Sequence, residues 1–148
     1  MSTRTWTQLA VVAAVIFVIV SFIRSCNSAP AQDQLFGTLS MLRADMDQIV
    51  HTGGRVISYD NNSKTTFSRV YLLLTADAGG RARELSAKYQ DSLLSRGWTP
   101  AGSSIDGLRF CKQGATASVR ASQDEQRIAV GMVFDAASIS TCRRHAVN

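Results

Sequence analysis

The chain has 148 residues, of which 45% are hydrophobic and 18% are charged, and its formal net charge is +5. This length corresponds to one ordinary domain, or to a tether followed by a domain of somewhat more than about 100 residues. The apolar content and small net charge exclude a largely disordered chain. The basic residues are scattered, so we expect no nucleic-acid partner.

The N-terminal part of the sequence contains an apolar run typical of a membrane-spanning helix. The run extends from Leu9 to Ile23 and is bracketed by Arg4 and Arg24. With the three residues before it, it is just long enough to cross a hydrocarbon core of about 30 Å. We therefore predict a signal-anchor over residues 1–25. Its membrane-spanning part, in contact with lipid, includes Leu9, Val15, Phe17 and Ile23.

Three other interpretations of this run stay open. Ala29-Pro30-Ala31 has the small-x-small form of a signal-peptidase site, which would make the mature protein secreted. Cys26 is in a position to be lipidated, although Arg24 lies inside the residues that would form the lipobox. The run is also compatible with a buried core helix of a soluble protein, although so small a domain would cover such a helix poorly.

The charges on the two sides of the run indicate its orientation. Arg4 and the amino terminus precede it without any acidic residue, whereas Arg24 is followed by Asp33. This difference favours a single-pass protein of the inner membrane with its N-terminus in the cytoplasm. Residues 26–33 are then a small, polar linker, and residues 34–148 are an extracytoplasmic, periplasmic domain.

Two of the three cysteines lie in the expected domain. Cys111 lies in an expected strand, and Cys142 follows the last expected strand. In an oxidising compartment the simplest use of such a pair is a disulfide. The bond would close a loop of about 30 residues, worth roughly 3–4 kcal/mol in the chain-entropy model. Two buried free thiols are the alternative.

The domain opens with a helical pattern. Apolar residues spaced alternately by four and three positions form one stripe, which predicts a helix that ends before Gly53-Gly54. We expect the stripe to pack on the domain's own sheet, with a dimer seam as the alternative. The stripe comprises Leu35, Leu39, Leu42, Met46 and Ile49.

A hairpin and a second helix follow. Residues 55–59 and the β-branched, aromatic segment 65–74 are predicted strands, and the Asp- and Asn-rich segment 60–64 is the predicted turn between them. A helix is predicted over residues 80–96, with Gly97 at its end and Trp98 folded back onto its last turn.

Three further strands complete the predicted fold. They cover residues 107–112, 115–121 and 126–134 and form an antiparallel meander, with Gln113-Gly114 as the turn between the first two. The tail from Asp135 onward is expected to hold a short turn of helix at most. The order is α-β-β-α-β-β-β after the membrane helix. This order predicts an α+β domain with two helices packed on one face of a mostly antiparallel sheet of about five strands.

The residues that carry chemistry form no recognisable motif. His51 follows the first predicted helix and His145 lies in the tail, and neither has a nucleophile at a motif spacing. Cys111 acting as a nucleophile with either histidine stays open. A zinc site built from Cys111, Cys142 and the two histidines would need an unusual ligand spacing. Glycine-rich phosphate loops are lacking. We expect no catalytic, cofactor-binding or metal-binding residues.

The expected function follows from location and architecture. We predict a non-enzymatic envelope protein whose domain binds another envelope protein or a second copy of itself, because sheet edges accept partner strands. The alternative is a periplasmic domain, from a secreted protein or a lipoprotein, that binds a small molecule, a lipid or a peptidoglycan fragment. In that case the alanine-rich strand 115–121 would leave a cavity over Ala117 and Val119.

Overall fold

The computed structural model describes residues 30–76, 81–104, 107–122 and 127–146. Within these ranges the chain is α+β, with three α-helices, one 3₁₀ turn and six strands. The helical elements are α2 (Gln32–Ile49), η1 (Val50–Thr52), α3 (Ala82–Ser95) and α4 (Ala136–His145). The strands are β1 (Arg55–Lys64), β2 (Phe67–Thr75), β3 (Thr99–Ser104), β4 (Gly107–Lys112), β5 (Ala115–Ala121) and β6 (Arg127–Asp135).

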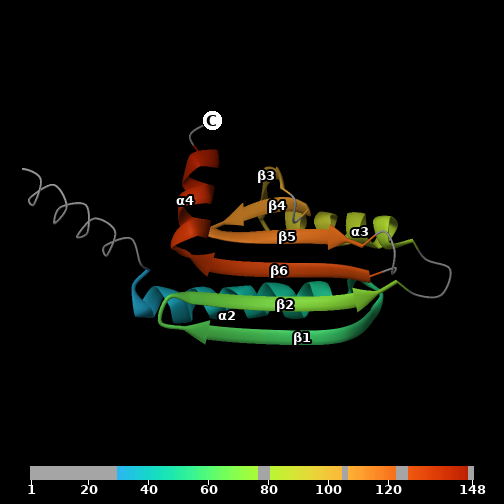
Figure 1. Ribbon diagram of the computed structural model, residues 1–148, viewed down its shortest axis with the longest axis horizontal. Coiled ribbons are helices and arrows are strands. Elements are labelled where there is room, and N and C mark those ends of the chain that lie inside the picture. The colour runs from blue at the N-terminus through green and yellow to red at the C-terminus, as the bar shows by residue number, and fades with distance from the viewer. Residues whose placement is uncertain (1–29, 77–80, 105–106, 123–126, 147–148) are drawn as a thin grey trace, which may run out of the picture.

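All six strands form one antiparallel sheet in the order β1-β2-β6-β5-β4-β3 (Figure 1). The predicted hairpin and meander are both present, and β6 returns along β2 to join them. The turn predicted at Gln113-Gly114 connects β4 to β5, and both residues have positive φ, at 49° and 82°. This is the backbone of a type I′ turn, whose twist matches that of the strands on either side.

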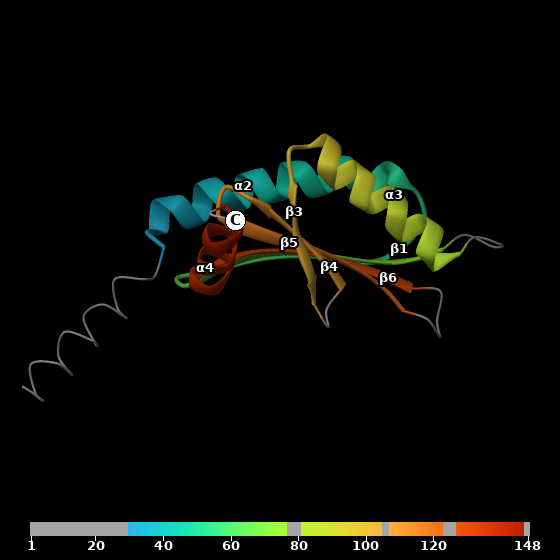
Figure 2. The ribbon, with the colours of Figure 1, turned by 90° about the horizontal axis from the view of Figure 1, so that it is seen from above.

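The helices are arranged around one face and one end of the sheet. Helices α2 and α3 lie on the same face (Figure 2), with α2 over β2 and β6 and α3 over β5 and β6. Helix α4 stands at the end of the sheet where α2 begins. The opposite face of the sheet carries the alternate, more polar residues of each strand.

The core lies between the sheet and the two covering helices. The five apolar stripe residues of α2 are 0–5% exposed, which confirms that they pack on the domain's own sheet. They are buried within the chain and do not form a dimer seam. Tyr89 and Trp98 are the largest fully buried side chains. Burying each large apolar side chain stabilises the fold by roughly 1.5–3 kcal/mol.

The sequence-based strand and helix assignments need three corrections. The expected turn at 60–64 is strand, because β1 pairs with β2 as far as Lys64 and Phe67 and the turn falls at residues 65–66. Strand β3 was not expected, and neither was the ten-residue helix α4. Polar and proline residues are tolerated on edge strands, since one side of the strand needs no ladder hydrogen bonds.

The predicted signal-anchor lies outside the described residues, including Leu9, Val15, Phe17 and Ile23. In the part of the chain that is described, no helix is both long and apolar enough to span a membrane. Helix α2 begins at Gln32, two positions before the expected start of the domain.

Candidate functional site

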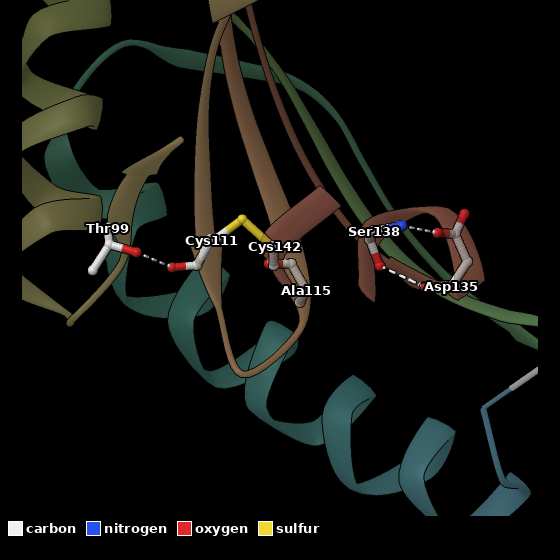
Figure 3. Close-up of a disulfide and its surroundings, with 6 residues drawn as sticks. All are labelled: Thr99, Cys111, Ala115, Asp135, Ser138 and Cys142. Carbon is white, nitrogen blue, oxygen red and sulfur yellow. Dashed lines mark hydrogen bonds between the residues drawn. A yellow bond between two sulfur atoms is a disulfide. The ribbon is translucent and has the colours of Figure 1, made fainter. Parts of the chain in front are cut away.

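Helix α4 is fixed at the end of the sheet by its cap and by a disulfide (Figure 3). The carboxylate of Asp135 accepts a 2.6 Å hydrogen bond from the backbone N–H of Ser138, and the Ser138 hydroxyl accepts one from the backbone N–H of Asp135. This reciprocal arrangement satisfies donors that the first helical turn leaves free.

The predicted Cys111–Cys142 disulfide is present and joins β4 to α4, with a sequence separation of 31 residues. Ala101 of β3 packs against it to form a small buried cluster. The carbonyl oxygen of Ala115 lies 3.2 Å from Cys142 Sγ. This is a contact and not a hydrogen bond, since a disulfide sulfur has no proton. The bond therefore holds one face of α4 against the turn between β4 and β5.

The disulfide removes both cysteines from the chemistry that the sequence left open. A bonded Cys111 is no thiolate nucleophile, and neither sulfur is free to bind zinc as a thiolate. His51 follows the C-terminal end of α2, whereas His145 ends α4 and lies near Pro100 and Gly102 of β3. The described residues contain no group of three His, Cys, Asp or Glu side chains placed to hold a metal ion.

An open groove of about 860 Å³ separates α4 from the N-terminal half of α2. Each wall is one helix face, formed by residues three or four positions apart. Gln34, Gly37 and Thr38 face it from α2, and positions 136, 139, 140, 143 and 144 face it from α4. Phe134 and the turn at Gln113-Gly114 form its floor.

The groove is basic on one wall and apolar at its floor. Arg143 and Arg144 are exposed, and neither guanidinium has an ion-pair or hydrogen-bond partner among the described residues. No acidic side chain in the described part of the chain lines the groove. A Cβ added at Gly37 would meet no atom within 4 Å, so the α2 wall leaves open space. The groove therefore suits an anionic group that carries an apolar portion.

A second polar cluster is buried between α2, β4 and Trp98, which lies in the segment between α3 and β3. Oδ2 of Asp45 accepts hydrogen bonds from Trp98 Nε1 at 2.9 Å and from Lys112 Nζ at 2.7 Å. Asp45 is only 8% exposed, and the ammonium of Lys112 lies 5.9 Å from the centre of the Trp98 ring. Each polar atom named here has a partner. The cluster joins three elements and leaves no free group for chemistry.

The third notable feature is the exposed edge strand β1. It pairs with β2 on one side only, and its pairing shifts register between Val56 and Ser58. Three large apolar side chains lie exposed along it, Val56 at 43%, Ile57 at 49% and Tyr59 at 37%. The hydroxyl of Tyr59 donates a 2.9 Å hydrogen bond to Asp47 of α2. Burial, followed by this bond, raises the pKa of Tyr59 to about 12.

Two basic side chains of the β1-β2 hairpin have partners within the chain. Arg69 forms an exposed ion pair with Asp60 at 3.1 Å. The ammonium of Lys64 lies 5.9 Å from the centre of the Phe67 ring.

The space over the alanine-rich strand is filled by side chains. Ala117 and Val119 are 1% and 2% exposed and belong to the same buried cluster as Tyr89, Leu93 and Trp98. The groove lies instead at the end of the sheet. Its walls come from segments about 100 positions apart in the sequence, so sequence spacing could not bring them together. A signal for α4 was present in Asp135-x-x-Ser138, which has the form of a helix cap.

Comparison of the chain with protein-family models, with curated proteins and with solved structures finds no match.

Proposed function

We propose that this chain is a membrane-tethered, non-enzymatic protein of the cell envelope whose extracytoplasmic domain binds an extended segment of another envelope protein along β1. The apolar run Leu9–Ile23, with its flanking arginines, supports the tether and its orientation. The Cys111–Cys142 disulfide supports an oxidising compartment, because such bonds are rare in the cytosol.

The observation that carries the binding proposal is the exposed edge of β1. The strand is ten residues long, and its outer side has no neighbouring strand in the described part of the chain. An edge of this kind presents backbone N–H and C=O groups that an extended peptide can pair with. Val56, Ile57 and Tyr59 would add apolar contacts to those hydrogen bonds.

The opposite edge of the sheet is a poorer acceptor. Strand β3 has six residues, contains Pro100, which has no N–H, and loses regular pairing between Pro100 and Ser103. Strand β1 is therefore the longer edge among the described strands and contains no proline, and its own register shift is confined to Val56–Ser58. A partner with alternating apolar residues would match its exposed side chains.

The proposal is tested with a photoreactive amino acid placed at Ile57 of the full chain in cells, followed by identification of the adducts. We expect one specific envelope protein, and we expect Ile57→Lys to weaken its recovery from crosslinked membranes. Leu94→Lys is the matched control, because Leu94 is 43% exposed on α3, away from β1. Failure to find a specific adduct would contradict partner binding at β1, and adducts between two copies would replace the partner by self-association.

A second candidate function is ligand binding in the groove between α2 and α4. It is favoured by the volume of about 860 Å³ and by the two arginines on one wall, which have no partner among the described residues. A small anionic molecule, a lipid or a peptidoglycan fragment would fit this chemistry. Titration of the full chain in detergent with candidate ligands, followed by heteronuclear NMR, would show shifts at Gly37 and Ile139 if the groove is occupied. Shifts elsewhere would count against this function.

A further inference from the structure

The groove lies where the folded domain joins its N-terminal segment. Pro30 is the first described residue, and it lines the groove together with Gln34 of α2. Ile23, the last residue of the apolar run, precedes Pro30 by seven positions. Seven residues span at most about 25 Å when fully extended. If the run is embedded in a bilayer, as proposed above, the groove opens within that distance of the lipid headgroups.

The charge of the groove matches a phosphate group. Arg143 and Arg144 project from adjacent positions of the last turn of α4, and no acidic side chain among the described lining residues offsets them. Guanidinium groups bind phosphate with two parallel hydrogen bonds, which makes arginine the preferred residue for this task. Helix α4 itself has no acidic residue, and the carboxylate of its N-cap, Asp135, lies at the other end of the helix and accepts a hydrogen bond from the backbone N–H of Ser138.

The floor and the opposite wall suit the remainder of a lipid headgroup. Phe134 on the floor and Ile139 on the α4 wall are apolar, and Gly37 leaves space on the α2 wall. The disulfide and the cap hold α4 in place, so the helical turn that carries the two arginines is positioned before any ligand arrives. A preorganised site loses less conformational entropy on binding.

We infer that the groove binds the phosphate of an anionic phospholipid, such as phosphatidylglycerol, in the leaflet that faces the domain. The inference rests on the proposed membrane tether. Binding there would hold this end of the domain at the membrane surface. The β1 edge runs along the side of the molecule away from α4 (Figure 1), so it would stay accessible to a partner.

The test uses the full chain reconstituted in nanodiscs that contain a photoactivatable phosphatidylglycerol or, separately, a photoactivatable phosphatidylcholine. We expect adducts of the anionic probe on both walls of the groove, at residues 34–38 of α2 and 139–144 of α4. Replacing both arginines, Arg143→Gln with Arg144→Gln, should lower this yield by about 30-fold at limiting probe, since each basic residue near an anionic surface contributes roughly a factor of five.

Two further variants test whether the yield depends on the charge of the groove itself and on the open space inside it. Arg81→Gln with Arg83→Gln removes an equally charged pair beside the start of α3, at the far end of the sheet, and should leave the yield unchanged. Gly37→Leu should lower the yield by filling the groove without changing its charge, and the open space at Gly37 lets the fold accept it.

Three results would overturn the inference. Equal labelling by the neutral and the anionic probe would show that the groove does not recognise the negative charge of the headgroup. Adducts confined to residues 1–29 would show that the lipid does not occupy the groove. Full competition by millimolar inorganic phosphate would make the ligand a free anion. A chain that does not enter the nanodisc would instead contradict the tether itself, which extraction of native membranes with carbonate tests independently.

Discussion

The indole Nε1 of Trp98 donates a 2.9 Å hydrogen bond to Oδ2 of Asp45, across 53 positions of sequence. The same oxygen accepts a hydrogen bond from the ammonium of Lys112, so one buried carboxylate joins α2, the segment between α3 and β3, and strand β4. Its removal would leave an indole N–H and a mostly buried cation without partners.

We expect Asp45→Ala to lower the free energy of unfolding by about 3 kcal/mol, because breaking a buried ion pair from one side leaves the other charge unpaired. Urea denaturation of both forms measures the difference. Asp47→Ala is the control: Asp47 is exposed and holds only Tyr59, so a loss of about 0.5–1 kcal/mol is expected. Equal losses of unfolding free energy in the two variants would show that the buried cluster stabilises the fold no more than an exposed hydrogen bond does.

Removal of the disulfide should destabilise the domain and release α4. Cys111→Ser with Cys142→Ser opens a loop of 31 residues, for which the chain-entropy model gives roughly 3–4 kcal/mol. The amides of residues 136–145 should then exchange with deuterium faster than those of the central strands. Cys26→Ser, outside the described residues, is the matched single-thiol control. Unchanged exchange in α4 would mean that its cap alone holds it in place.

Tyr89 should make the domain sensitive to alkaline pH. Burial raises its pKa to about 12 from the ordinary 10.0, and its hydroxyl donates a 3.0 Å hydrogen bond to the carbonyl of Gly53. Because the folded pKa lies above the unfolded one, the stabilisation is complete below pH 10 and is lost as pH rises towards about 12. A shift of this size corresponds to roughly 2–3 kcal/mol.

The comparison with Tyr89→Phe isolates this effect from the titration of other groups. At neutral pH the variant should lose about 1 kcal/mol with the hydrogen bond. Between pH 10 and 12 its unfolding free energy should fall less steeply than that of the parent chain. Parallel curves over this range would show that Tyr89 ionises as freely in the folded state as in the unfolded one.

Two glycines should respond in opposite directions to substitution by alanine. Gly37 lies inside α2 with open space around it, so Gly37→Ala should stabilise the domain by roughly 0.5–1 kcal/mol. Gly107 has a φ of 104°, and a Cβ there would collide with the carbonyl group of Val119 in the neighbouring strand. Thermal unfolding should therefore show a higher midpoint for Gly37→Ala and a lower one for Gly107→Ala, and the reverse order would contradict the backbone described here.

The elements predicted correctly are those marked in the sequence by a regular apolar spacing or by particular residues such as glycine and cysteine. The stripe on α2, the end of α3 near Gly97, the turn at Gln113-Gly114 and the disulfide are confirmed. Each of these depends on local spacing or on a single residue with a special conformation. Helix α3 is two residues shorter at its start than expected, which is within the usual uncertainty of helix ends.

The elements that were missed depend on tertiary contacts. Pro100 and Gly102 argue against a strand, yet β3 forms because β4 offers an unpaired edge. The DNNSK sequence of β1 resembles a turn, but its pairing with β2 continues through it. The groove could not be predicted, because Arg143 and Arg144 indicate only a solvated pair until α4 is placed beside α2. The register of a long hairpin and the packing of a terminal helix are decided by neighbours distant in sequence.

Partner binding at β1 and lipid binding in the groove both require a domain that stays joined to its apolar N-terminal segment and lies outside the cytoplasm. The most direct measurement is the intact mass of the protein purified from membranes, with thiols alkylated before and after reduction. We expect the mass of all 148 residues, with Cys111 and Cys142 reactive only after reduction. A chain that begins at Gln32 or at a lipidated Cys26, or three thiols that react without reduction, would contradict this account.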